Sequence, residues 1–304
     1  MNANLHLHSK FSDGSLWPED IVRGAAHLGL ELIALTDHDT MGGSERFAAE
    51  CAAQGLSCMT ACEIDVADSA IGYKSELLAY FPGKTYLECN ATRAMLARVL
   101  NERRKRLDYY LYWARVFFKR EDLSLEDMIQ RRKADGMVSN EELSILSWSK
   151  VDLFLYLRSK KLVPAYMNYK LFKKEWMRPG RFPKYKLSKP DTLACLASVH
   201  ADRGFSVIPH IGHLWNDDPE EMEKQQHQVK VLLEFFRTRG VDGVELYWYS
   251  SSKKSAAIND LVRKLAQPMG YFFTYGSDCH GPDTDKYTID KFSGDFPGFP
   301  LSRQ

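Results

Sequence analysis

Two histidines, an aspartate and a glycine stand close together in the stretch NLHLHSKFSDG near the beginning of the chain. Side chains alternate between the two faces of a β-strand, so we expect His6 and His8 to share one face while Leu5 and Leu7 pack on the other. Two imidazoles on one face form a candidate metal clamp, and Asp13 in the following loop is a third candidate ligand. One such pair among 9 histidines is weak evidence alone, so the assignment depends on further ligands.

Further histidines and carboxylates follow apolar stretches that are typical of strands. Each alone has a structural alternative, either a hydrogen-bonded core histidine or an acidic helix cap. Their recurrence at strand ends instead predicts one shared metal site, because a barrel would gather them on one face. Asp37 and Asp39 flank one of these histidines, and we interpret them as carboxylates that orient ligating imidazoles. The additional candidate ligands are His38, Glu63, Glu76, His210, Asp278 and His280.

The elements that must position these side chains alternate between strand-like and helix-like patterns. Apolar strand stretches end in polar residues, and amphipathic stretches follow them. This alternation predicts a parallel α/β fold with its site at the carboxyl ends of the strands. We expect a loop after about residue 283. The predicted strands are 3–8, ELIALTDHDT, LSCMTACEID, SELLAYF, FSVIPHIGH, VDGVELYWY and YFFTYGSDCHG, and the predicted helices are 18–28, 44–54, 191–203, 223–238 and 254–266.

The middle of the chain has a different composition. Residues 84–190 contain long, charged, aromatic-rich helical stretches and carry 25 lysines and arginines against 12 acidic residues, a net charge of +13. The remainder carries 16 against 28, a net charge of −12. We therefore expect an inserted basic helical subdomain at 84–190 and a metal-binding barrel formed by 1–83 and 191–304. The basic part favours an anionic substrate or polymer, and the alternative is an ordinary solvated helical surface.

Bulk properties exclude several classes of protein. The chain of 304 residues is long enough for a large core, has no apolar run of about 18 residues and shows no leader pattern, so we expect a cytoplasmic protein that does not contact membranes. Its 6 cysteines lack C-x-x-C spacing, which favours reduced thiols over a disulfide framework or a zinc ribbon. No protein partner is evident.

The motifs resemble those of the PHP (polymerase and histidinol phosphatase) superfamily. HLHSKFSDG, LTDHDT, the Glu63 segment, IPHIGH and GSDCHG occur in the order of that family. The resemblance implies a distorted (β/α)7 TIM-like barrel with an inserted helical subdomain and two or three divalent metal ions, which are Mn²⁺, Zn²⁺, Fe²⁺ or Mg²⁺. The pattern H-x-H-S-x-x-S-D-G with T-D-H-D-T looks most like the phosphoesterases that act on nucleotide 3′,5′-bisphosphates or short RNA, and less like the histidinol phosphatases.

The resemblance also implies which residues bind the metals. Glu76 stands where the family usually has a histidine, and a glutamate there would shift preference towards metals that favour oxygen ligands. The remaining ligands implied are His6, His8, Asp13, His38, Glu63, His210, Asp278 and His280.

Two departures from the family pattern concern the substrate. The family's Gly-Arg-Pro-His segment, which contacts phosphate, aligns with Ser149, Lys150, Val151 and Asp152, so a point-charge lysine replaces a bidentate arginine. The usual His-Pro-Gly-Arg is His-Ile-Gly-His here and ends in His213. We expect Lys150 and His213 to bind substrate. His213 is also a candidate acid for the leaving alkoxide, and the alternative is a surface histidine.

These residues together predict a metal-dependent phosphoesterase. The substrate would be a small phosphorylated molecule, a nucleotide 3′,5′-bisphosphate in the first instance, attacked by a hydroxide that the metal ions activate. His38 would be part of the catalytic machinery. Aromatic residues at 109–113 would either stack a base or form a helix core.

Two other functions stay open at this point. A 5′→3′ exonuclease or other RNA-processing phosphodiesterase would use the basic insertion to hold a polymer through many phosphate contacts. A metal-binding module that has lost catalysis would account for the replaced arginines and for Glu76, since fold resemblance alone does not establish an activity.

Overall fold

The computed structural model describes residues 1–136, 139–284 and 286–300. The chain divides into two compact units: a barrel unit, Met1–Met95 with Pro190–Gln304, and a helical unit, Leu96–Lys189. The helical unit therefore begins inside a long helix, later in the chain than the insertion expected at 84–190.

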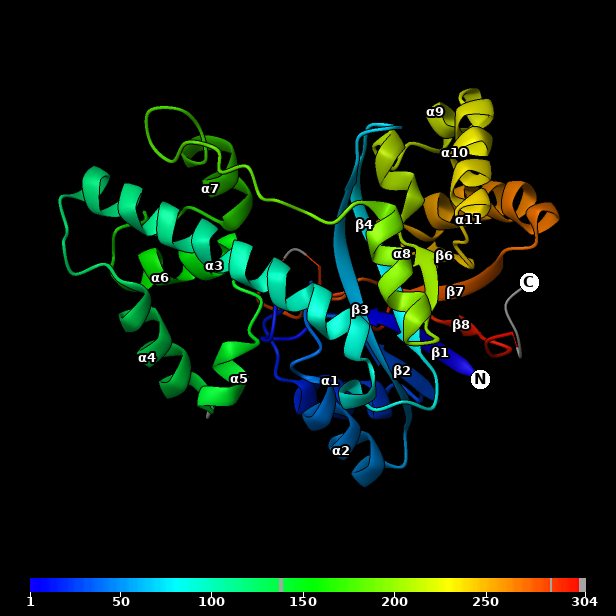
Figure 1. Ribbon diagram of the computed structural model, residues 1–304, viewed down its shortest axis with the longest axis horizontal. Helices are drawn as coiled ribbons and strands as arrows, with labels where there is room; N and C mark the ends of the chain where they lie inside the picture. Colours follow the sequence, from blue (N-terminus) through cyan, green and yellow to red (C-terminus); the bar gives the residue numbers. More distant parts are fainter. Residues whose placement is uncertain (137–138, 285, 301–304) are drawn as a thin grey trace. The chain divides into compact units, whose positions relative to one another are not determined.

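The barrel unit is built on an eight-stranded sheet with the order β7-β6-β5-β4-β3-β2-β1-β8 (Figure 1). A parallel bridge between Leu7 and Cys279 joins β1 to the segment after β7, so the sheet is nearly closed. This mixed α/β barrel confirms the distorted TIM-like fold expected from the sequence. The strands are β1 (Asn2–Leu7), β2 (Leu32–Leu35), β3 (Ser57–Asp68), β4 (Tyr73–Phe81), β5 (Phe205–Ile208), β6 (Gly243–Tyr247), β7 (Phe272–Gly276) and β8 (Gly294–Asp295).

Strand β4 runs against the direction of its neighbours. It pairs antiparallel with β3 and with β5, whereas β1–β2, β2–β3, β5–β6 and β6–β7 are parallel. The uniform β/α alternation that we expected is therefore wrong here. The connection from Asp68 to Tyr73 is too short for a crossover helix, and a short connection forces a hairpin. Glu76 consequently lies in the first half of β4, opposite Asp65, rather than at the carboxyl end of a strand.

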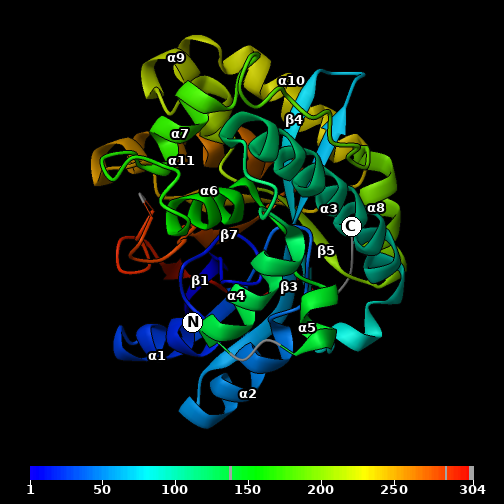
Figure 2. The same cartoon turned by 90° about the vertical axis from the view of Figure 1, so that its left-hand side faces the viewer.

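Helices cover the outside of the barrel (Figure 2). In both views α1 and α2 lie together on one flank, and α9, α10 and α11 lie on the opposite flank. The helix expected at 223–238 is two helices that meet at Gln225, and the tail expected to be a loop supplies β8. The helices are α1 (Pro18–His27), α2 (Ser44–Gln54), α8 (Thr192–Ala201), α9 (Pro219–Lys224), α10 (Gln226–Thr238) and α11 (Ser252–Ala266), with 3-10 turns at Tyr86–Glu88, Ile211–Trp215 and Gln267–Met269.

The register of β1 shifts between Asn4 and Leu7, and this irregularity changes which side chains face inward. Leu5 belongs to the cluster inside the barrel, where the Tyr80 hydroxyl donates to its carbonyl at 2.9 Å. Leu7 instead packs in the outer cluster with Ile21 of α1. The expectation that Leu5 and Leu7 share one side is therefore wrong, because a bulge interrupts strict alternation.

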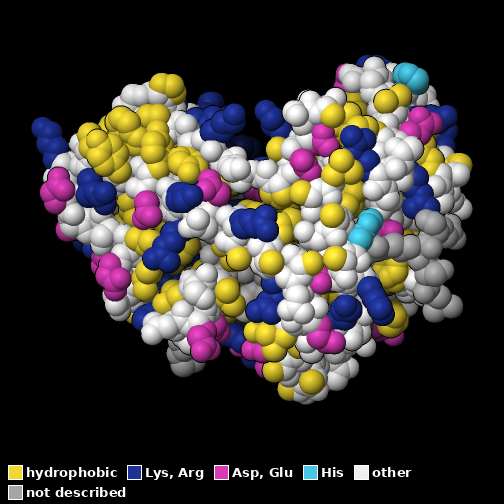
Figure 3. Space-filling model, in the orientation of Figure 1, with side chains coloured by type: hydrophobic (Ala, Val, Ile, Leu, Met, Phe, Trp, Pro, Cys, Tyr) yellow, Lys and Arg dark blue, Asp and Glu magenta, His cyan; other side chains and the backbone are white. Residues whose placement is uncertain are grey.

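The helical unit has an aromatic core. Phe172 and Phe182 are fully buried, and their rings lie 6.0 Å apart beside Trp176. Hydrophobic side chains also gather on the surface of this unit over α7 (Figure 3). Among the described residues, no helix is both long and apolar enough to cross a membrane. The helices are α3 (Asn90–Phe118), which begins in the barrel unit, α4 (Leu125–Gly136), α5 (Asn140–Ser144), α6 (Lys150–Ser159) and α7 (Tyr169–Trp176).

Candidate metal centre

Three adjoining groups of potential metal ligands lie in the barrel unit. In each group, one ligand atom per residue lies within 4.8 Å of all the others. Every metal ligand expected from the sequence falls in at least one group, and two residues are shared. The Asp13 group is His8, Asp13, His38 and His280, the Asp278 group is His6, His8, Glu63 and Asp278, and the Glu76 group is Glu63, Glu76 and His210.

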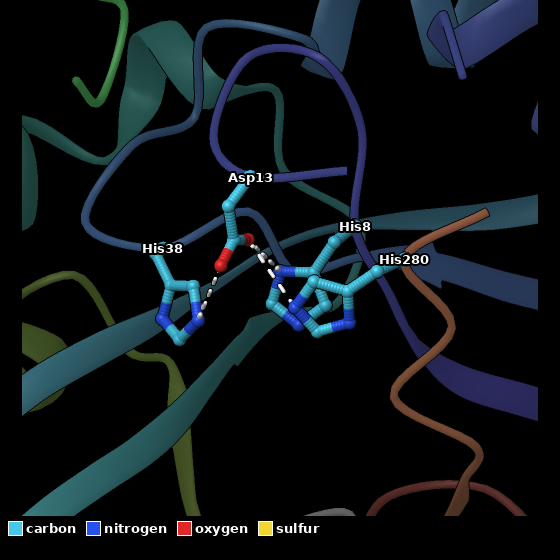
Figure 4. A group of neighbouring side chains, drawn as sticks. All are labelled: His8, Asp13, His38 and His280. Carbon is cyan, nitrogen blue, oxygen red and sulfur yellow. Dashed lines mark ion pairs between the residues drawn. The ribbon is translucent and has the colours of Figure 1, made fainter. Parts of the chain in front are cut away.

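The Asp13 group is arranged around one carboxylate (Figure 4). One Asp13 oxygen lies 3.3 Å from His280 Nε2 and 3.9 Å from His8 Nδ1, while the other lies 3.8 Å from His38 Nε2. The His8 and His280 rings stack with their centroids 4.3 Å apart. Three imidazoles therefore approach one carboxylate from different elements.

Hydrogen bonds to Asp37 fix the loop that carries Asp13. This buried carboxylate accepts bonds from the Ser9 backbone at 2.7 Å and from the hydroxyls of Ser9 and Ser12 at 2.6 and 2.5 Å. Asp37 was expected to orient an imidazole, but the bonds observed fix this loop instead. Gly14 is required at the turn because a Cβ there would lie 2.3 Å from the His8 carbonyl oxygen. The S-x-x-S-D-G part of the motif thus serves to place Asp13.

Four ligand atoms converge in the Asp278 group. His8 Nε2 lies 3.1 Å from His6 Nε2, 3.3 Å from Glu63 Oε2 and 3.1 Å from Asp278 Oδ1. His6 Nε2 lies 3.4 Å from the same glutamate oxygen and 3.6 Å from the same aspartate oxygen. Tetrahedral ligands with bonds of about 2.1 Å lie about 3.4 Å from one another. The observed separations therefore fit a small divalent ion.

Glu63 faces two groups with its two oxygens. Oε2 points to His6 and His8, whereas Oε1 lies 3.1 Å from His210 Nε2 in the Glu76 group. Glu76 Oε2 lies 3.9 Å from the same histidine nitrogen. A carboxylate in this position has the donor atoms needed to bridge neighbouring cations.

Buried imidazole nitrogens in this region lack protein partners. Nδ1 of His8 and Nδ1 of His210 are buried with no hydrogen-bond partner among the described residues. A buried polar atom without a partner destabilises a fold, and metal ligation is one way to satisfy an imidazole nitrogen. This donor set, with imidazoles beside carboxylates, fits divalent metals.

The electrostatics of the site show how closely opposite charges are packed. Burial lowers the pKa of His8, but hydrogen bonds and charges from Asp278 and Glu63 outweigh burial and raise that pKa to about 10. Burial raises the pKa of Glu63, yet His38 and His6 hold the pKa of this carboxyl well below its usual range. The side chains are thus arranged for a concentration of positive charge between the carboxylates.

Glu245 on β6 is an important residue that sequence reasoning missed. Its Oε1 lies 2.7 Å from His6 Nδ1, and its Oε2 accepts the His210 backbone N–H at 2.8 Å. A bond at Nδ1 leaves Nε2 as the ligand atom, so Glu245 orients His6 towards the Asp278 group. Gly276 lies beside this pair, where a Cβ would fall 2.0 Å from Glu245 Oε1. A single acidic residue in the buried strand VELY was the available signal.

Two candidate ligands have backbone conformations that L-residues rarely adopt. His210 has φ +27° and Asp278 has φ +51°. Each such residue costs on the order of 1–3 kcal/mol and is typical of functional sites. The backbone is therefore strained at the two places where the chain leaves β5 and β7 and turns into the site.

His213 lies beside the Glu76 group. Its ring stacks on that of His210 with centroids 4.5 Å apart, and its Nδ1 lies 2.6 Å from Asp217 Oδ1. Its side chain is 34% exposed, so solvent reaches the ring. The structure thus places His213 next to the ligand groups, while its part in binding or catalysis stays a prediction.

The other predicted substrate contact, Lys150, opens α6 in the helical unit. Ser149 and Asp152 around it form a capping box, in which the Asp152 carboxylate accepts the Ser149 N–H at 2.7 Å. Asp152 also pairs with Arg132 at 3.1 Å. These residues begin a helix, and a role for Lys150 in substrate binding stays a prediction.

The aromatic residues proposed as a base-stacking surface separate into core and surface. Tyr110 is 1% exposed and packs against Phe182, so its ring cannot receive a base. Tyr112 is 53% exposed. The alternative that this stretch forms a helix core is therefore correct for Tyr110.

Two known proteins are similar to this chain in sequence. A 3′,5′-nucleoside bisphosphate phosphatase from Chromobacterium violaceum is 42% identical over 65 residues, which cover 21% of this chain and only 23% of that relative. A 5′-3′ exoribonuclease from Haemophilus influenzae is 23% identical over 281 residues, which cover 92% of this chain and 90% of that relative.

A solved structure shares the fold. A protein assigned as a metal-dependent phosphoesterase from Bifidobacterium adolescentis has a TM-score of 0.68 at 19% identity, with 93% of this chain and 89% of that chain covered. The family model described as PHP domain matches residues 4–246, which run from β1 to β6 and leave out α11, β7 and β8. Together with the ligand groups, this match shows that the chain belongs to the PHP domain family.

Proposed function

We propose that the protein is a metal-dependent phosphoesterase that hydrolyses a phosphate monoester of the nucleotide 3′,5′-bisphosphate type. The observation that carries the proposal is the sharing of Glu63, a carboxylate whose two oxygens face the Asp278 and the Glu76 groups. Shared ligands favour neighbouring cations, which is the arrangement that phosphoester hydrolysis uses. The partial relative that acts on 3′,5′-nucleoside bisphosphates supports the choice of substrate.

The three groups would hold two or three divalent ions. The Asp13 group offers three imidazoles and one carboxylate, a set that suits Zn²⁺ or Fe²⁺, whereas the two carboxylates of the Glu76 group favour Mn²⁺ or Mg²⁺. When bound, such ions stabilise negative charge on phosphate oxygens and lower the pKa of a water molecule towards about 7. His38 lies between Asp13 and Glu63, 3.8 Å from the first at Nε2 and 3.2 Å from the second at Nδ1, and would ligate an ion through one of these nitrogens.

His213 is the proposed acid for the leaving alkoxide. Asp217 binds Nδ1, so Nε2 is the ring atom from which a proton would be transferred. Burial raises the pKa of Asp217, but the hydrogen bond and charge of His213 outweigh burial, so that pKa is below its usual value. The carboxylate therefore stays charged and orients the ring. The His213 side chain is partly exposed, so a substrate has access to the ring.

A second function, 5′→3′ exonucleolytic cleavage of RNA, has support of its own. The relative from Haemophilus influenzae that carries this name aligns over nearly the whole of both chains. The basic composition of residues 84–190 would suit a polymer with many phosphates. Polymer binding of this kind weakens steeply with salt, whereas a small bisphosphate needs fewer cationic contacts.

The test is phosphate release with Mn²⁺ from a nucleoside 3′,5′-bisphosphate, a nucleoside 5′-monophosphate and a short 5′-phosphorylated RNA, each at two salt concentrations. Turnover of the bisphosphate alone would support the first function. Preferential cleavage of RNA, with a Michaelis constant that rises steeply with salt, would support the second.

A pair of variants distinguishes the two enzymatic functions from a metal-binding module without activity. His38→Ala should abolish turnover, whereas His227→Ala, at an exposed histidine of α10, should leave it unchanged. Stoichiometric metal in the wild-type protein without turnover on any of the three substrates would contradict the proposal.

A further inference from the structure

Lys286 reaches the Asp278 group from the segment after β7. Its ammonium pairs with Asp278 Oδ2, and the Tyr247 hydroxyl donates to the same oxygen at 3.1 Å. The other aspartate oxygen, Oδ1, faces His6 and His8. Asp278 therefore turns one oxygen towards the ligand groups and the other towards a lysine and a tyrosine.

The backbone around Lys286 is fixed to the site. Its carbonyl accepts the His280 N–H at 2.8 Å, and its own N–H donates to the Thr284 hydroxyl at 3.1 Å. Further along, the Thr288 hydroxyl donates to the Ser277 carbonyl at 2.8 Å. The segment is thus tied on both sides to the residues that present Asp278, so the backbone of Lys286 is fixed beside the site.

The Lys286 side chain is paired and still accessible. It is 45% exposed, and an ammonium has three donors, of which Asp278 Oδ2 uses one. A lysine ammonium is charged at neutral pH. A charged donor with hydrogens that no described residue accepts therefore lies beside the Asp278 group.

We propose that Lys286 is a phosphate-binding residue of the barrel. The inference rests on the function proposed above. The ligand groups contain four carboxylates, Asp13, Glu63, Glu76 and Asp278, whose negative charge two divalent ions would just neutralise. Lys286 adds a positive charge for a dianionic phosphate to meet.

The two departures from the family pattern leave this chain without the usual phosphate-binding arginines, and Lys286 would compensate for them. At the family's two arginine positions this chain has Lys150, in the helical unit, and His213. Neither offers the bidentate fork of an arginine. Lys286 supplies a permanent positive charge from within the barrel unit, beside the ligand groups themselves.

The test measures the affinity of the metal-loaded protein for inorganic phosphate by calorimetry, with bound metal determined by elemental analysis. Lys286→Met should weaken phosphate binding by about tenfold to a hundredfold, since a charged hydrogen bond is lost. Metal content should not change, and Lys286→Arg should restore most of the affinity. Lys291→Met, at an exposed lysine of the same tail that pairs with Asp290, is the matched control and should bind phosphate as the wild type does.

Tyr247→Phe separates phosphate binding from support of Asp278, because it removes the other contact to Oδ2 without changing charge. Unchanged phosphate affinity in Lys286→Met would overturn the inference, and so would equal losses in Lys286→Met and Tyr247→Phe accompanied by loss of metal. If the wild-type protein hydrolyses esters but Lys286→Met binds phosphate as tightly as the wild type, the proposed function stands and the inference about Lys286 fails. Lysine-dependent phosphate binding without hydrolysis of any ester would reject the function and keep the site.

Discussion

The barrel unit and the helical unit use their buried space in opposite ways. The barrel concentrates imidazoles and carboxylates at one end, with Glu63 and His6 almost fully buried. The helical unit buries aromatic rings such as Phe172 and Phe182 and uses acidic side chains such as Asp152 to cap helices. Concentrated charge destabilises a fold unless counter-charges are present, whereas aromatic burial stabilises it directly. Substitutions in the barrel should therefore act on metal binding, and those in the helical unit on folding.

The largest effect is expected for Glu63→Gln. The substitution keeps the shape of the side chain but removes the charge that faces both the Asp278 and the Glu76 groups. We expect turnover to fall by about 10³-fold or more, together with bound metal. Kinetic and metal analysis of Glu63→Gln beside Glu234→Gln, at an exposed residue of α10, would measure this. Full metal content and activity in Glu63→Gln would remove the reason to treat the groups as one centre.

A stability effect is expected in the helical unit. Tyr110→Ala should reduce the free energy of unfolding by about 3 kcal/mol, because it opens a cavity beside Phe182. Tyr112→Ala, at an exposed position of the same helix, should change it by less than about 0.5 kcal/mol. Denaturant unfolding with metal analysis tests both variants. Loss of barrel metal in folded Tyr110→Ala would show that a change in the helical core alters metal binding in the barrel.

A smaller effect is expected for Glu245→Gln. The variant keeps the packing but weakens the charged contact that orients His6. Residues that orient metal ligands typically contribute 10–100-fold in metal affinity, so we expect a loss of about that size. Titration against a competing chelator measures it, and Glu234→Gln, at the exposed position of α10, serves for comparison. An unchanged affinity would mean that strand geometry alone orients the imidazole.

The smallest effect, counted per pH unit, is a dependence of metal affinity on pH. In the metal-free protein the pKa of His8 is raised to about 10, so this imidazole holds a proton at pH 7 and a metal ion must displace it. Apparent affinity should therefore rise about tenfold for each pH unit between pH 6 and pH 8. Chelator competition at three pH values, with calorimetry in buffers of different ionisation enthalpy, would detect the proton released. Equal affinity across this range would contradict the charge arrangement described for the barrel.

Much of the barrel could be predicted because most of its candidate metal ligands lie at the ends of strands. The spacing of His6 and His8, and the polar residues after β2 and β7, are visible in sequence and are brought together by the fold. Strand direction was not visible, since the pattern of β4 is the same whether the strand runs up or down. The bulge in β1 was hidden for a similar reason, because bulges depend on pairing with a neighbour.

The residues that support the site were harder to find than its candidate ligands. Glu245 is one acidic side chain in an apolar strand, and Lys286 follows the last motif by several residues in a stretch without a pattern. Asp37 was recognised as important but given the wrong partner, since its serine contacts depend on how the loop before it folds back. Supporting residues act through three-dimensional proximity, and proximity between distant segments is not encoded in local spacing.

Closure of the barrel has a consequence for how the protein is made. The Asn4 amide donates to the Ser277 hydroxyl across 273 residues of chain, and Leu7 bridges to Cys279 in the same seam. At about 5–20 residues per second, the ribosome would take roughly 15 to 55 s to reach this second half of the seam after making the first. His6 and His8 are synthesised long before Asp278 and His280. A nascent chain that has not reached His280 therefore holds only fragments of the centre, and the full set of candidate ligands is present only after that residue has been made.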